Sequence, residues 1–136
     1  MRIEGWERRL SDYLETCRNK SFEWGTHDCV LFAGDICLLL CGIDPAVAAR
    51  GQYQSKEQAF ELLKQHGLSQ AGIMDAHFSR IKPFAAQRGD IVYRRSESGA
   101  AFGTVYNGRA VYLAQTKGCI SESLTGADVA WRIESF

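Results

Sequence analysis

The sequence predicts an α+β fold in which helices come first and antiparallel strands follow. The first helix shows the helical period clearly, because its apolar residues are three, four, three and four positions apart: Ile3, Trp6, Leu10, Tyr13 and Cys17. After residue 88 the pattern changes to short runs rich in β-branched and aromatic residues. Asn107-Gly108 separates two of these runs and predicts a tight hairpin turn.

A second helix is expected over residues 29–41, a segment that is apolar nearly all round. A helix of that kind is normally buried in the centre of a domain. Gly42 is a natural stop after its last turn, and the side chain of Thr26 or Asp28 can accept hydrogen bonds from its first free amides. This assignment places Cys29 in the first turn of a central buried helix.

A third helix is expected to start at Ser55, which forms a capping box with Gln58, and to end at Gly67. Three helices thus precede the first clear strand. The expected strands cover residues 90–95, 101–106, 109–115, 119–123 and 129–133.

The length of 136 residues fits one domain, residues 1–136, that can bury a substantial core. Sixteen basic and sixteen acidic residues cancel, so no electropositive face for nucleic acid is expected. The apolar run at residues 31–40 is too short to cross a bilayer and is interrupted by Gly34 and Asp35, so no membrane span is predicted. The charged N-terminus does not resemble a secretion signal.

Five cysteines, an odd number without a CxxC pair, favour reduced thiols over a disulfide framework. A metal site is the other interpretation, with Cys37 and Cys41 one helical turn apart and His27 with Cys29 or Cys119 completing a tetrahedral set. Cysteines at this spacing in a Leu-rich helix are better explained as core residues. We therefore expect neither a metal nor another cofactor.

Cys29 itself has two interpretations. A thiol in the first turn of a helix is close to free amides and to the positive end of the helix dipole, which lower its pKa and favour a nucleophilic thiolate. Cysteine is also among the most buried residues and often only packs in a core.

The three tryptophans could stack a ligand or pack in the protein. We expect Trp6, Trp24 and Trp131 to anchor the core or an interface rather than to stack a ligand.

The segment 22–29, Phe-Glu-Trp-Gly-Thr-His-Asp-Cys, followed by an apolar helix, resembles the nucleophile motif of the NlpC-type superfamily of papain-like cysteine peptidases. Residues 88–93 resemble the Gly-Asp strand of that superfamily, and residues 101–108 resemble its next hairpin. The resemblance implies a papain-like α+β domain, with a central buried helix packed on a bent antiparallel sheet and Cys29 in the place of the nucleophile.

In active relatives, His-x-Gly opens the strand after the Gly-Asp segment, and that histidine is the general base. The corresponding register here places Ala101 before Phe102-Gly103, and the residue that would orient the base falls near Tyr112. A nucleophile without its base loses activation, so only Cys29 is carried over as a candidate catalytic residue. The three histidines, His27, His66 and His77, are expected at the surface or at helix ends.

Two functions therefore remain open. The short length, the opening helix and the closing Ala130-Trp131-Arg132 are similar to small NlpC-type proteins of phage and prophage tail gene clusters. This implies a tail-tip or tail-assembly module in the virion tail, made in the host cytoplasm, whose partners are other tail-tip or baseplate proteins. The alternative is an active cysteine peptidase or amidase that uses Cys29 on cell-wall (peptidoglycan) peptides.

Overall fold

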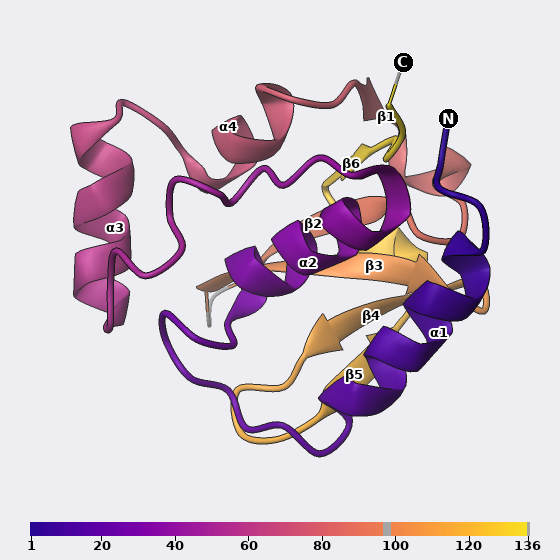
Figure 1. Ribbon diagram of the computed structural model, residues 1–136, viewed down its shortest axis with the longest axis horizontal. Coiled ribbons are helices and arrows are strands. Elements are labelled where there is room, and N and C mark those ends of the chain that lie inside the picture. Colours follow the sequence, from indigo (N-terminus) through magenta and orange to yellow (C-terminus); the bar gives the residue numbers. More distant parts are fainter. Residues whose placement is uncertain (97–98, 136) are drawn as a thin grey trace.

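The observed helices contain the three that the sequence predicts and one more. The computed structural model describes residues 1–96 and 99–135. In these residues the helices are α1 (Trp6–Cys17), α2 (Cys29–Cys41), α3 (Lys56–Gln65) and α4 (Gln70–Asp75). None of them combines the length and the apolar character that crossing a bilayer requires. Figure 1 shows α1 and α2 in front of the sheet and α3 at the margin of the molecule.

The strands form one antiparallel sheet in the order β1-β6-β2-β3-β4-β5. Their bounds are Arg80–Ile81 for β1, Ile91–Ser96 for β2, Gly99–Tyr106 for β3, Arg109–Leu113 for β4, Cys119–Glu122 for β5 and Val129–Trp131 for β6. All five predicted strands are present, so the α+β class is confirmed. Helix α4 and strand β1 were not predicted, because six and two residues are too few to show a period.

The predicted hairpin turn joins β3 to β4. Asn107 and Gly108 have φ angles of 52° and 73°, and Tyr106 pairs with Arg109 across the turn. Positive φ at both central residues is the geometry of a type I′ turn, which matches the twist of the flanking strands. The Asn-Gly prediction is therefore confirmed in its detail.

The sheet has a different core on each face. On one face α1 and α2 pack against Ile91, Phe102 and Trp131, all at most 1% exposed. On the other face a smaller cluster includes Val92 and Tyr112, next to two short 3-10 turns. Successive residues of a strand point to opposite faces, which is why Ile91 and its neighbour Val92 belong to different clusters. Most residues of α2 are buried, so α2 is the central buried helix that the sequence predicts.

The two residues that interrupt the apolar sequence of α2 hold the following loop. A Cβ on Gly34 would lie 2.8 Å from the Cβ of Ala46, so only glycine lets the loop approach this closely. Asp35 accepts a hydrogen bond from the Tyr13 hydroxyl at 2.7 Å and forms a 2.8 Å ion pair with Arg50. One polar network thereby connects α1, α2 and the loop.

Asp90, the acidic residue of the Gly-Asp segment, ties the two ends of the chain together. Its carboxylate is fully buried and accepts hydrogen bonds from the guanidinium groups of Arg2 (2.8 Å) and Arg132 (3.0 Å). The backbone amides of Gln87 (2.9 Å) and Ile133 (3.1 Å) complete the set. A buried charge with two cationic partners and two amide donors is fully compensated.

Replacing this carboxylate should destabilise the fold strongly. We expect Asp90→Asn to lower the free energy of unfolding by about 3 kcal/mol, because two half-buried guanidinium groups lose their counter-ion. Urea unfolding followed by circular dichroism measures the change. Asp12→Asn is the matched control, since Asp12 is exposed and its ion pair with Arg8 is long, at 3.8 Å. This substitution should change the free energy of unfolding by no more than about 0.5 kcal/mol. Equal effects of the two substitutions would contradict the account of Asp90.

Candidate functional site

The candidate site is built around Asp28, the residue before α2. Asp28 is the N-cap of the helix, and its Oδ1 accepts a hydrogen bond from the Leu31 amide at 3.0 Å. Its Oδ2 accepts from the Gly25 amide at 2.9 Å and from the Tyr53 hydroxyl at 2.6 Å. The side chain is fully buried. Of the two caps that the sequence allowed, Asp28 is the one used, and it also binds a turn and a loop to the start of the helix.

The turn before Asp28 closes tightly on the Tyr53 loop. The backbone N–H groups of Glu23 and His27 each donate to the carbonyl oxygen of the other, at 2.9 and 2.8 Å. Gly25, inside this turn, has a φ of 83°, and a Cβ there would lie 2.1 Å from the Tyr53 carbonyl oxygen. Glycine is therefore required at this position for both its backbone angle and its lack of a side chain.

Cys29 follows in the first turn of α2, where the sequence predicts it, and its side chain is only 7% exposed. Burial raises the pKa of its thiol to about 11, and the negative charge of Asp28 adds to this effect. The backbone amides of Phe102, Cys29 and Val30 lower the pKa but do not offset the burial. Of the two interpretations of Cys29 that the sequence left open, the raised pKa favours the packed core residue, because removal of the thiolate from water outweighs stabilisation by the helix start.

None of the three histidines hydrogen-bonds the Cys29 thiol in the described parts of the chain. His66 ends α3, and His77 lies just beyond α4, where both line an apolar hollow of about 180 Å³ whose walls do not include Cys29. His27 was expected at the surface or at a helix end, but it is only 7% exposed and its Nε2 has no hydrogen-bond partner within residues 1–96 and 99–135. Sequence proximity to Cys29 therefore does not make His27 its base.

The strand position that adjoins the thiol is Phe102, not Ala101. Phe102 packs in the same cluster as Cys29, and its backbone amide is near enough to the sulfur to lower the pKa of the thiol. Ala101 packs against the cluster on the opposite face of the sheet, as does Tyr112, whose ring lies under the Arg94 guanidinium at 4.4 Å. The register inferred from the motif therefore places both the position of the base, Ala101, and the position of the residue that would orient it, Tyr112, on the face of the sheet away from Cys29, because strand side chains alternate.

The other cysteines and the tryptophans lie mostly in the core. Cys37 and Cys41 are buried, and the Cys41 thiol donates to the carbonyl oxygen of Cys37 at 3.3 Å. Within residues 1–96 and 99–135, no group of three or more His, Cys, Asp or Glu side chains is arranged to hold a metal ion. Trp131 is fully buried and donates to Asp75 at 2.8 Å, as expected of a core anchor.

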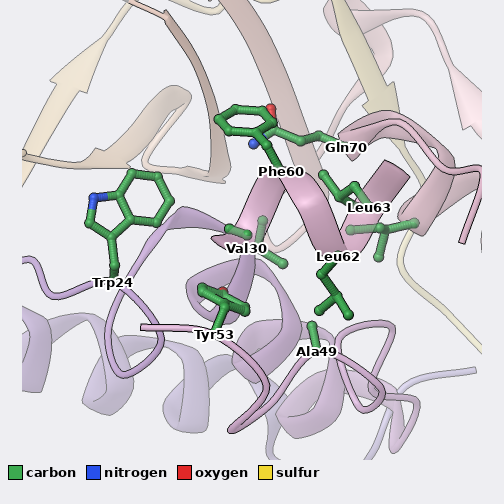
Figure 2. Close-up of a pocket in the computed structure, with 10 residues that line it drawn as sticks. Trp24, Val30, Ala49, Tyr53, Phe60, Leu62, Leu63 and Gln70 are labelled. Carbon is green, nitrogen blue, oxygen red and sulfur yellow. The ribbon is translucent and has the colours of Figure 1, made fainter. Parts of the chain in front are cut away.

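A small pocket beside the first turn of α2 is closed to a peptide. Its volume is about 30 Å³, which leaves room for about two water molecules. Its walls are Trp24, Val30, Ala49, Tyr53, Ala59, Phe60, Leu62, Leu63, Gln70 and Ile73. Figure 2 shows Trp24 and Phe60 around this space, with Tyr53 and Val30 beside them. Cys29 is not part of the wall, so the pocket does not lead to the sulfur.

One family model matches residues 1–133 of the chain, and its description is "Domain of unknown function (DUF6950)". The chain belongs to the DUF6950 family. No curated protein matches the sequence. Membership in DUF6950 covers α1 to β6, so the Asp28 cluster and the Asp90 cluster both lie within the family domain.

Tyr53 is the member of this site that sequence reasoning missed. It lies in a loop without a period, 25 positions from its hydrogen-bond partner Asp28. Burial and the hydrogen bond to Asp28 raise the pKa of its hydroxyl, so it stays a neutral donor. One local signal indicates that Tyr53 is held in place: it lies between Gly51, a residue typical of turns, and Ser55, the N-cap of α3. A loop this short between two such residues can adopt few conformations.

His27 should make the protein less stable in acid. Burial and, secondarily, Lys20 lower the pKa of its imidazole below the usual value, while Asp35 and Asp28 oppose them. The unfolded chain, with a pKa of about 6.5, then binds a proton more readily than the folded one. The stabilising contribution of neutral His27 is complete above that pH and declines as the pH falls below it.

Urea unfolding between pH 7.5 and pH 5 tests this expectation. His27→Gln should flatten the pH dependence, because the titrating group is removed, whereas the exposed His66→Gln should retain it. A parent protein equally stable across this range would show that His27 keeps the same proton affinity after folding.

Proposed function

We propose that this protein is a non-catalytic module, built on an NlpC-type papain-like fold, that serves as a structural or binding component of a phage tail tip. The single observation that carries the loss of catalysis is the state of Cys29. Its thiol is 7% exposed, has a raised pKa of about 11 and, among the residues that the structure describes, has no imidazole hydrogen-bonded to it. At neutral pH such a thiol is almost entirely protonated, and the thiolate is the form that acts as a nucleophile.

The arrangement of the elements supports the fold part of the proposal. A cysteine at the start of a central buried helix is followed in the chain by an antiparallel sheet whose first long strand begins after Gly89-Asp90. The residue of β3 that adjoins the sulfur is Phe102. A phenylalanine beside the thiol is consistent with an NlpC-type protein in which a core residue has replaced the catalytic base.

The tail context rests on the resemblance of the sequence to small tail-associated proteins. Partners would be other tail-tip or baseplate proteins, met in the host cytoplasm during assembly. A formally neutral chain offers little long-range steering to a partner. Exposed apolar side chains, among them Val47 (68%) and Phe84 (82%), supply the kind of contact that such assemblies bury.

The rate of alkylation at Cys29 against pH tests the loss of catalysis. Cys119 is the internal control, because the pKa of its thiol is also raised to about 11 but its side chain is more exposed. In the native protein we expect Cys29 to react more slowly than Cys119 at every pH from 7 to 9, and in urea we expect equal rates. Peptide mass spectrometry after iodoacetamide treatment measures both sites in one sample.

Two outcomes would overturn the proposal. Faster reaction of Cys29 than of Cys119 at pH 7, together with hydrolysis of peptidoglycan peptides that Cys29→Ala abolishes, would establish the peptidase alternative. Absence of the chain from purified tails of the phage that encodes it would remove the tail assignment while leaving the alkylation result intact. The two parts of the proposal therefore fail separately.

A further inference from the structure

The turn at residues 23–26 and the Tyr53 loop enclose a second, larger hollow, on which the proposed function does not depend. This Trp24 hollow has a volume of about 580 Å³ and is lined by Glu23, Trp24, Thr26, Tyr53 and Gln54 together with two glycines. Small-ligand sites usually enclose about 300 to 1,000 Å³. Trp24 and Tyr53 also line the small pocket in Figure 2, so the two spaces share these two residues.

The chemistry of the lining defines the class of ligand. The indole of Trp24 is half-buried, and its ring is braced edge to face by Phe22 with the ring centres 5.1 Å apart. Glu23, Thr26 and Gln54 are exposed and offer a carboxylate, a hydroxyl and an amide, that is, acceptors and donors together. None of the lining residues in the described chain carries a positive charge, so a phosphate or another anion would lack a partner.

The hollow is held in one shape by the buried carboxylate of Asp28. Its Oδ2 binds the Gly25 amide from one wall and the Tyr53 hydroxyl from the other. The close approach of Gly25 to the Tyr53 carbonyl oxygen fixes the distance between these walls. A site whose walls are fixed before binding loses little conformational entropy when a ligand enters.

We propose that the Trp24 hollow binds a neutral saccharide, with one sugar ring packed on the indole of Trp24 and its hydroxyl groups hydrogen-bonded to Glu23 and Gln54. A sugar has an apolar face of C–H groups and a rim of hydroxyls that both donate and accept. That combination matches an aromatic wall bordered by a carboxylate and an amide. The Glu23 carboxylate already accepts a long hydrogen bond of 3.5 Å from the Thr26 hydroxyl, and a purely apolar ligand would displace water from the remaining polar atoms without replacing its hydrogen bonds.

Titration of the ¹⁵N-labelled protein with N-acetylglucosamine tetramer tests the assignment by NMR. We expect the indole N–H signal of Trp24 to shift saturably at millimolar sugar, while the signal of the fully buried Trp131 stays in place. Gln54→Ala and Glu23→Gln should each weaken binding about tenfold, as loss of one hydrogen bond to a ligand does. Both residues are exposed, so these variants should fold normally.

Trp24→Ala should abolish binding, and Phe84→Ala is its matched control. Phe84 is an exposed aromatic residue beside a different hollow, and its replacement should leave the affinity unchanged. Absence of any shift of the Trp24 signal at millimolar sugar would overturn the proposal. So would a shift with tetramethylammonium but not with the sugar, because the hollow would then be a cation site formed by Trp24 and Glu23.

Discussion

The carboxylate of Asp28 is the interaction on which the organisation of the candidate site depends. It accepts three hydrogen bonds, from the first turn of α2, from the Gly25 turn and from Tyr53. The central helix, a tight turn and a loop distant in sequence are therefore fixed relative to one another by one buried group. Cys29 directly follows Asp28 in the chain, and Gly25 and Tyr53, which Asp28 binds, line the Trp24 hollow, so both take their positions from this group.

The state of Cys29 shows which of two opposed effects is larger. The start of a helix stabilises a nearby negative charge by typically about 0.3 to 1 kcal/mol. Removing an ionised group from water costs several kcal/mol. At Cys29 the sulfur is almost fully covered and Asp28 adds a second negative charge, so the pKa rises although three amides face the thiol. Position at a helix start is therefore insufficient to make a cysteine reactive.

Much of the fold was predictable because it follows from local signals. The apolar period of α1, the capping residues Asp28 and Ser55, the stop at Gly42 and the Asn107-Gly108 turn each act within a few residues. The site was less predictable, since its contacts join distant segments. No sequence signal near Tyr53 indicates that its hydroxyl hydrogen-bonds Asp28. The face of the sheet to which Ala101 points depends on the strand register rather than on a motif.

The most direct test of this account is a double-mutant cycle between Asp28 and Tyr53, using Asp28→Asn, Tyr53→Phe and the combined variant. If Asp28 holds the two segments together, the free energies of unfolding should be non-additive, with a coupling of about 1 to 3 kcal/mol. Both single variants should also increase the alkylation rate of Cys29, because the start of α2 loosens. Additive free energies would contradict the central role of this carboxylate.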